Sequence, residues 1–216
     1  LVGFDLDVAT EVCARLGLEL VKQPINWKNQ VNEINNDNVD CLWNGMSKTE
    51  GREQTLNLSI PYMKNNQIIL VKQDAPYQNM ADLAGKNLGV QAGSSAEEAL
   101  NASTEFKNSL GDIINLDDYS KAIMEMKNGT IDAIAIDEVV ARYYLTKEPN
   151  TYRILTKEDG SVESLAVEDY VIGFKIGDDA LKTKIEDTLK DMAKDGKLAE
   201  ISTKWFGEDV TTIVEE

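Results

Sequence analysis

Four stretches of the chain gather residue types that could bind a charged small molecule. The first is residues 44–52, with the sequence NGMSKTEGR, directly after an expected strand. Asn44, Gly45 and Ser47 are small or polar residues that expose backbone groups there. The planar guanidinium of Arg52 matches a carboxylate in two parallel hydrogen bonds. The other interpretation is an ordinary capped turn that carries a surface arginine.

The second stretch, 89–97, has the sequence GVQAGSSAE and places two serines at the start of an expected helix. Free backbone amides and the helix dipole favour an anion at such a position. Ser94 and Ser95 are therefore candidates for binding a carboxylate, with Gln91 beside them. The alternative is a plain serine N-cap, in which Glu97 or Glu98 completes a capping box.

The third stretch ends at Asp137, which directly follows an apolar strand pattern over 131–136. Ligands of open α/β sheets bind at the carboxyl ends of strands, and a carboxylate there suits an ammonium group. The alternative is that Asp137 caps the following helix. The fourth set is aromatic. Trp27 could form a flat wall against a ligand, Tyr62 is a further candidate, and Trp43 is better interpreted as core.

Composition excludes several classes of function. The chain has 216 residues, of which 22 are basic, 38 are acidic and none is histidine, so its formal net charge is −16. This charge disfavours nucleic acid and anionic lipid as partners. Without histidine there is no Ser-His-Asp or Cys-His nucleophile and no histidine metal site. We expect neither a metal nor a cofactor, and no apolar run approaches the roughly 18 residues of a membrane helix.

Hydrophobic periodicity predicts two α/β halves. The first begins with a helix capped by Asp5 or Asp7 and stopped by Gly17. Strands are expected over 18–21, 39–43, 67–71, 87–90, 113–116, 133–136 and 170–174. Further helices are expected over 27–36, 80–84, 95–100, 119–128, 138–144, 181–192 and 198–205.

Taken in order, these stretches resemble the family 3 solute-binding proteins of polar amino-acid ABC transporters. The matching segments are 3–7, 26–27, 39–40, 45–52, 59–62, 82–86, 90–95, 131–133, 198–201 and 204–207. The resemblance implies a two-lobed periplasmic-binding-protein-like fold of type II, joined by two crossing strands. Lobe one would comprise 1–66 and 171–216, and lobe two 67–170. The lobes would close over an amino acid.

The resemblance also assigns roles to individual residues. Arg52, Ser94 and Ser95 would bind the α-carboxylate, and Asp137 would pair with the α-ammonium. The remaining candidates are the Gly45 carbonyl and Ser47 on the ammonium, Trp27 as a wall, and, as a second tier, Asn44, Gln91 and Tyr62. The family carries a strand and an aromatic loop before the segment that matches 3–7. This chain has neither. Either those residues belong to the native protein and are absent from this chain, or the fold is altered and lobe one lacks its first strand.

The resemblance implies a binding protein rather than an enzyme. It would act outside the cytoplasm, in the periplasm or lipid-anchored at the cell surface, as a monomer that delivers a polar amino acid to an ABC permease. Two alternatives are an enzyme of the periplasmic dehydratase kind on the same scaffold and a ligand-sensing domain of a receptor. An extracytoplasmic location favours a disulfide between Cys13 and Cys41 over two buried free thiols.

Overall fold

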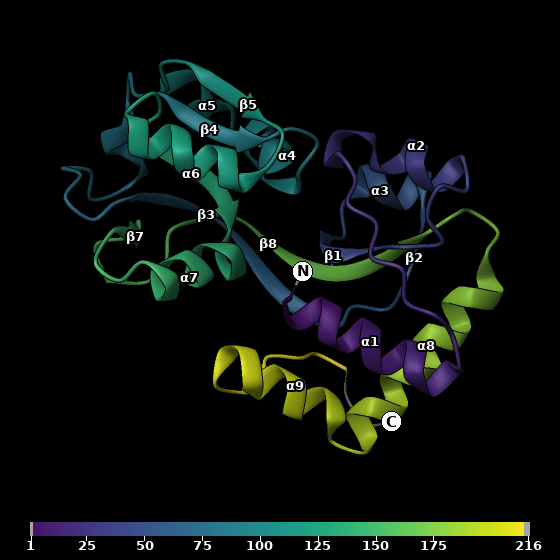
Figure 1. Cartoon of the computed structure of the whole chain (residues 1–216). Coiled ribbons are helices and arrows are strands. Elements are labelled where there is room, and N and C mark those ends of the chain that lie inside the picture. Colours follow the sequence, from purple (N-terminus) through teal and green to yellow (C-terminus); the bar gives the residue numbers. More distant parts are fainter. Residues whose placement is uncertain (1, 214–216) are drawn as a thin grey trace. The chain divides into compact units, whose positions relative to one another are not determined.

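The computed structural model describes residues 2–213 and divides into two compact units. Unit 1 holds the chain up to residue 25, residues 29–64 and the chain from residue 168 onward; unit 2 holds 26–28 and 65–167. Two long strands run from one unit into the other, β3 (Met63–Lys72) and β8 (Ser164–Phe174) (Figure 1).

Segment 26–28 is grouped with unit 2, whereas the resemblance placed it in lobe one. Its backbone lies close to the turn that contains Gly93, where an added Cβ would come within 2.9 Å of the Lys28 Cα. The side chain of Asn26 also forms a hydrogen bond with Asp117. These contacts group the segment with unit 2 although the residues on both sides of it belong to unit 1.

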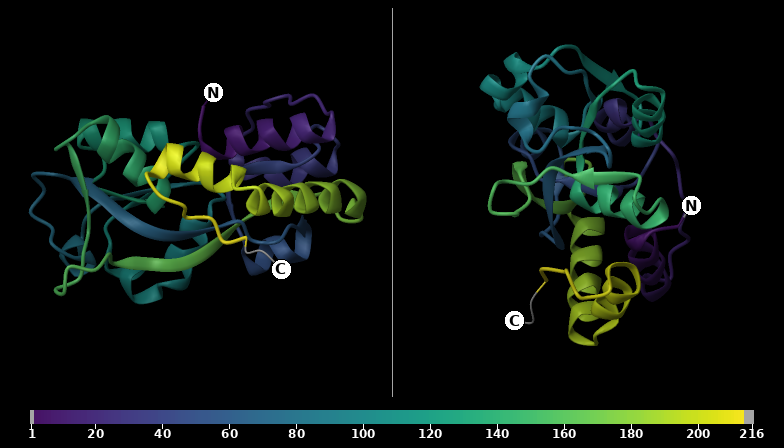
Figure 2. Two further views of the ribbon diagram at one scale, coloured as in Figure 1. Left: turned by 90° about the horizontal axis from the view of Figure 1, so that it is seen from below. Right: turned by 90° about the vertical axis from the view of Figure 1, so that its left-hand side faces the viewer.

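Unit 1 combines a helical layer with a small antiparallel sheet. The helices α1 (Phe4–Leu16), α8 (Asp179–Lys194) and α9 (Lys197–Phe206) contact one another (Figure 2). The strands β1 (Leu42–Ser47) and β2 (Asn57–Leu58) both pair antiparallel with the last part of β8. Two short helices, α2 (Gln30–Asn35) and α3 (Glu50–Thr55), flank β1 in the sequence, and a 3-10 turn, η1 (Trp27–Asn29), precedes α2.

Unit 2 is a sheet covered by helices on both faces. The strand order is β3-β6-β4-β5, where β6 (Ala133–Asp137), β4 (Leu88–Gln91) and β5 (Ile113–Leu116) are parallel and β3 is antiparallel to β6. A short strand, β7 (Tyr152–Ile154), pairs with β3. Figure 1 shows α6 on one face of β4 and β5 and α4 and α5 on the other. The helices of this unit are η2 (Met80–Leu83), α4 (Ser95–Ala102), α5 (Thr104–Ser109), α6 (Tyr119–Asn128) and α7 (Glu138–Lys147).

Each face of this sheet has its own hydrophobic core. One core joins Val90 of β4 to Ala96 and Leu100 of α4, and the other joins Ile136 of β6 to Met126 of α6. Burial on both faces explains why β6 is apolar at successive positions rather than alternating. The last residue of β6 is Asp137, so this buried strand ends in a carboxylate.

Most of the expected elements are present. Gly17 ends α1 and Gly129 ends α6 in the left-handed conformation, as the sequence predicts. Asp5 and Asp7 lie inside the first turn of α1 and are not its cap, which is Gly3. The strand expected over 39–43 begins later, at Leu42. Among residues 2–213, no helix has the length and apolar character of a membrane span.

The strand expected over 18–21 is wrong. These residues carry no strand assignment, and the side chains of Leu18 and Val21 are 48% and 73% exposed. A β-rich pattern specifies a strand only when a partner edge supplies its hydrogen bonds, and no pairing with this segment occurs among the described strands.

Candidate functional site

The first group of predicted residues lies in unit 1, on a bulge in β1. Leu42 is opposite Gly173 and Met46 is opposite Val171, so β1 advances four residues where β8 advances two. Gly45 lies in this bulge with a φ of +61°, and an added Cβ would meet the Tyr170 hydroxyl at 3.3 Å. The left-handed backbone and this close approach both require glycine. The exposed Asn44 lies in the same bulge.

A buried carboxylate from α1 holds the bulge. Asp5 Oδ2 accepts a hydrogen bond from the Gly45 amide at 2.5 Å, and Asp5 Oδ1 accepts one from the Tyr62 hydroxyl at 2.8 Å. Burial raises the pKa of Asp5 to about 6, although both hydrogen bonds lower it. Tyr62 is fully buried, so this second-tier candidate belongs to the core of unit 1, where its hydroxyl positions Asp5.

Arg52 lies on α3, which begins directly after the bulged strand. The Thr49 hydroxyl caps this helix by accepting the Arg52 amide at 3.3 Å. The cap was one part of the alternative interpretation, but the other part fails because the Arg52 side chain is buried rather than on the surface. Its Nη1 donates to the Ser47 carbonyl at 2.6 Å. The Ser47 hydroxyl is itself buried and has no hydrogen-bond partner among the described residues.

The second group lies in unit 2, around Asp137. Asp137 Oδ1 accepts from Asn65 Nδ2 and from Gln67 Nε2, each at 2.8 Å, and Oδ2 accepts from the Tyr119 hydroxyl at 2.9 Å. Asp137 occupies the N-cap position of α7, as the alternative interpretation expected, but its side chain makes no capping hydrogen bond there. Burial first, and then the nearby Asp137 charge, raise the pKa of Tyr119 well above its usual value, which keeps this hydroxyl a donor.

The serine turn of unit 2 confirms Ser94 as the N-cap of α4, but Glu97 bonds the Gly93 amide instead of the Ser94 amide of a capping box. The Ser94 hydroxyl accepts the Glu97 amide at 3.2 Å and donates to the Gln91 carbonyl at 2.7 Å. Glu97 Oε2 accepts the Gly93 amide at 2.6 Å, so this helix start already holds a carboxylate of its own. Ser95 is buried, and its hydroxyl accepts from Gln67 Nε2 at 3.1 Å. The side-chain amide of Gln67 therefore links Asp137 to Ser95.

The remaining candidates have less constrained surroundings. Trp27 is half-buried at the first position of η1. Gln91 is half-buried, and its Nε2 donates to the Asp117 carbonyl at 3.2 Å. Trp43, for which the sequence favoured a core position, is half-buried on β1.

Sequence reasoning missed four residues that position the predicted ones: Asp5, Asn65, Gln67 and Tyr119. Gln67 was included in an apolar strand, although it is fully buried and polar. A signal was present in the sequence, because the apolar run of β3 is preceded by three consecutive amides at 65–67. Their alternation places Asn65 and Gln67 on one face of the strand and Asn66 on the other.

The disulfide favoured from the sequence is not formed, because Cys13 and Cys41 are both free thiols in the structure. They are close enough to interact, since burial, then Asp40 and then Cys13 raise the pKa of Cys41 to about 12. Both are half-buried, so the alternative interpretation holds for the free thiols but not for full burial.

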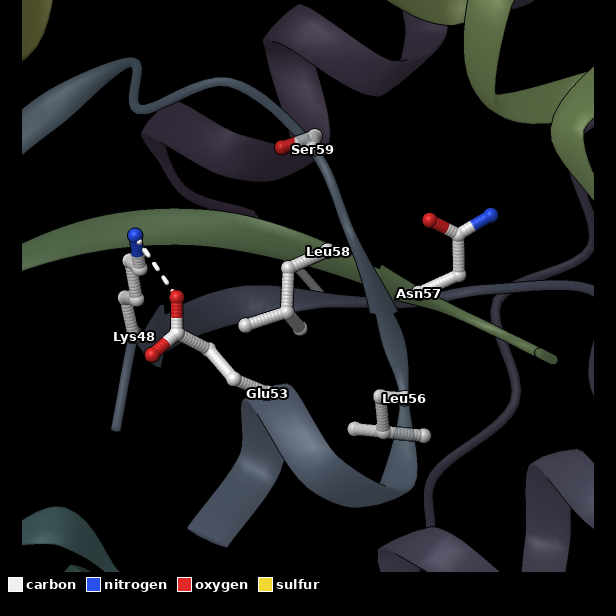
Figure 3. A pocket seen from close by; sticks show the side chains of 6 residues that line it. All are labelled: Lys48, Glu53, Leu56, Asn57, Leu58 and Ser59. Atoms are coloured by element: carbon white, nitrogen blue, oxygen red, sulfur yellow. Dashed lines mark ion pairs between the residues drawn. The ribbon is translucent and has the colours of Figure 1, made fainter. Parts of the chain in front are cut away.

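A separate pocket of about 250 Å³ lies within unit 1 (Figure 3). Its lining includes the ion pair between Lys48 and Glu53, at 2.8 Å, and none of the predicted ligand-binding residues. The exposed rim charges satisfy each other, so this pocket offers no unpaired charge for a ligand. Among the described residues, no group of three or more cysteine or acidic side chains is arranged to hold a metal ion.

Comparison with known proteins gives the chain a family. Residues 1–208 match the model for bacterial extracellular solute-binding proteins, family 3. The chain belongs to this family. This confirms the resemblance seen in the sequence. The members of this family are solute-binding proteins rather than enzymes.

Individual relatives of this family 3 protein are amino-acid binders. It is 27% identical to the L-cystine-binding protein TcyJ of Escherichia coli, over 98% of this chain and 76% of that one. It is also 27% identical to the arginine-binding extracellular protein ArtP of Bacillus subtilis, over 95% of this chain and 78% of that one. An ABC uptake transporter substrate-binding protein of Streptococcus pneumoniae, solved with bound histidine, is 37% identical with a TM-score of 0.90, covering 97% and 85% of the two chains. The α/β class and the periplasmic-binding-protein-like fold expected from the sequence are confirmed.

Proposed function

We propose that this family 3 protein binds a free polar α-amino acid and delivers it to the permease of an ABC transporter. The observation that carries the proposal is the burial of two opposite charges, the Arg52 guanidinium in unit 1 and the Asp137 carboxylate in unit 2. A zwitterion carries one charge of each sign, so each of these two buried charges matches the opposite charge of one ligand group.

The carboxylate end of the ligand is assigned to Arg52, Ser94 and Ser95. Arg52 offers two parallel donors in a fixed plane, and the start of α4 carries the positive end of the helix dipole. Glu97 already accepts the Gly93 amide at that helix start. Arg52 is therefore the dominant partner for the ligand carboxylate, and the two serines contribute polar contacts around it.

The ammonium end is assigned to Asp137, the Gly45 carbonyl and the Ser47 hydroxyl. Ser47 supports the proposal independently of any relative, because its buried hydroxyl has no partner among the described residues. A buried polar atom without a partner costs about 1–3 kcal/mol, which a ligand N–H recovers. Trp27 is the proposed wall, and the exposed Asn44 and half-buried Gln91 are peripheral polar contacts; the fully buried Tyr62 acts through Asp5.

The relatives support an amino acid as ligand without selecting one, since those named above bind cystine, arginine or histidine. The proposed site of action is outside the cytoplasm, in the periplasm or at a lipid-anchored cell surface, with the chain acting as a monomer and without catalysis. The family of bacterial extracellular proteins supports this location.

A thermal-shift screen of the twenty amino acids plus L-cystine tests the proposal. A ligand at about 100 times its Kd stabilises the folded state by about 2.7 kcal/mol, so a polar amino acid that binds raises the Tm by several degrees. Calorimetry then checks for one-to-one binding and recovery of the unchanged amino acid. Absence of binding to any of these compounds, or turnover of a cyclic carboxylate, would contradict the proposed function.

A further inference from the structure

We infer that Asn65 is a further ligand-binding residue, whose side-chain carbonyl oxygen accepts a hydrogen bond from the ammonium group of the bound amino acid beside Asp137. The inference rests on the proposed function and concerns unit 2 alone. Asn65 lies on β3, was not among the candidates from the sequence, and is 3% exposed.

The orientation of the Asn65 amide follows from its neighbour. Asn65 Nδ2 is 2.8 Å from Asp137 Oδ1 and donates to it. The opposite orientation would place the amide oxygen against a carboxylate oxygen, and two acceptors repel each other. The carboxylate therefore determines which end of the amide faces it, and the carbonyl oxygen Oδ1 faces the other way.

That oxygen is the feature that points to a ligand. Asn65 Oδ1 is buried and has no hydrogen-bond partner among the described residues. Buried acceptors are almost always satisfied, so one that is not points to a hydrogen-bond donor that arrives with a ligand. It is bonded to the same carbon as the nitrogen that contacts Asp137, so it lies a few ångströms from the proposed ammonium partner. An ammonium group has three donors and can reach both acceptors.

The backbone around Asn65 makes its position reproducible. Gln67 lies directly opposite Asp137 in the antiparallel pairing of β3 with β6, and Asn65 lies two residues earlier on the same face. Gln67 Nε2 bridges Asp137 and Ser95, so three polar side chains from β3, β6 and α4 fix one another. A hydrogen-bond acceptor held this rigidly loses little entropy when it binds a ligand.

The neighbouring amide, Asn66, provides a matched control. Its Nδ2 donates to Glu138 Oε2 at 2.6 Å, so it too binds a carboxylate where β6 ends and α7 begins. It lies on the opposite face of β3 and is half-buried. Replacing Asn66 removes the same chemical group without touching the Asp137 cluster.

The experiment measures binding of L-histidine and L-arginine to wild type, Asn65→Ala and Asn66→Ala by calorimetry. We expect Asn65→Ala to weaken binding about tenfold, since a hydrogen bond to a charged group is lost, and Asn66→Ala to leave the affinity within about twofold. Asn65→Ser, which keeps a small polar group, serves if the alanine variant does not fold. Equal affinity of wild type and Asn65→Ala would overturn the inference.

A second comparison separates direct contact from an effect through Asp137. In the Asp137→Ala background, Asn65→Ala is expected to weaken binding by a further factor of about five. No further loss would show that Asn65 only positions Asp137. A crystal structure of the wild-type complex should place the ligand nitrogen within about 3.2 Å of Asn65 Oδ1. If wild type binds neither amino acid, the proposed function fails for them and the inference fails with it; if wild type binds and Asn65 makes no contact, only the inference fails.

Discussion

Asp5 accepts the backbone amide of Gly45 at 2.5 Å, although 40 positions separate the two residues in the sequence. The contact joins the first turn of α1 to the bulge of β1. It fixes the peptide plane between Asn44 and Gly45, next to the Gly45 carbonyl that is proposed to bind the ammonium group. The Tyr62 hydroxyl donates to the other carboxylate oxygen, so both oxygens of this buried acid have partners. In unit 1, the buried carboxylate of Asp5 therefore positions Gly45, one of the proposed ligand-binding residues.

This buried charge makes stability depend on pH. Burial raises the pKa of Asp5 from 3.8 to about 6, so the folded protein binds this proton more tightly than the unfolded chain. The contribution is full below about pH 3.8 and is lost as the pH rises through about 6. Asp5→Asn removes it, and the free energy of unfolding of the variant relative to wild type should rise by on the order of 3 kcal/mol between about pH 4 and pH 7.

Urea unfolding at the two pH values measures this difference, and Asp7→Asn is the control. Asp7 lies in the same turn, but its pKa is lowered, chiefly by a hydrogen bond from Lys204. Its contribution is therefore present above the unfolded pKa and lost as the pH falls, with the opposite sign. A pH dependence of Asp5→Asn equal to that of wild type would show that Asp5 does not titrate in this range.

Replacing Gly45 by alanine tests the bulge itself. An L-residue with positive φ costs about 1–2 kcal/mol, and the new Cβ would also lie 3.3 Å from the Tyr170 hydroxyl. Gly160→Ala is the control, because Gly160 has a φ of +82° with nothing within 4 Å of the added Cβ. Chemical denaturation should therefore show a larger loss for Gly45→Ala than for Gly160→Ala. Equal losses would mean that the crowding by Tyr170 relaxes without cost.

The fold was largely predictable because its elements carry their own signals. The helix α6 has a buried stripe and a glycine stop, and β6 is an uninterrupted apolar run ended by a charge. Residues 18–21 have no partner strand among the described residues, and a local sequence pattern does not show whether a partner strand is available. For the same reason the sequence indicated Arg52 and Asp137 but not Asn65 or Gln67. Their roles depend on the register that sets Gln67 opposite Asp137, a contact between residues 70 positions apart.

Arg52 should be the most sensitive position for carboxylate binding. Arg52→Ala removes one partner of a desolvated charge pair, which costs about 2–5 kcal/mol, so the Kd for the bound amino acid should rise at least about tenfold. Arg52→Lys keeps the charge without the planar fork and should also bind more weakly. Arg142→Ala is the control, because Arg142 is exposed and pairs with Glu138. Wild-type affinity of Arg52→Ala in calorimetry would remove this residue from the site.

Asp137→Asn tests the ammonium partner with almost no change in volume. The variant loses the charge, and its amide NH₂ would face donors from Asn65, Gln67 or Tyr119. The Kd should rise at least about tenfold. The control is Asp132→Asn, directly before the same strand, where the carboxylate also accepts a hydrogen bond from a tyrosine hydroxyl, that of Tyr77, at 2.8 Å. If both variants bind equally well, the carboxylate of Asp137 is not a ligand.

The two thiols give a prediction opposite to the one made from the sequence. Because Cys13 and Cys41 are free, alkylation under denaturing, non-reducing conditions should label both, and prior reduction should change nothing. In the folded protein Cys41 should react at least about a hundredfold more slowly than an unperturbed thiol, because a pKa of about 12 leaves almost no thiolate near neutral pH. The pKa of Cys13 is also raised by burial, but less. In the Cys41→Ser variant, mass spectrometry should therefore show labelling of Cys13 at the faster rate. No labelling of the unreduced wild type would instead indicate a disulfide between Cys13 and Cys41.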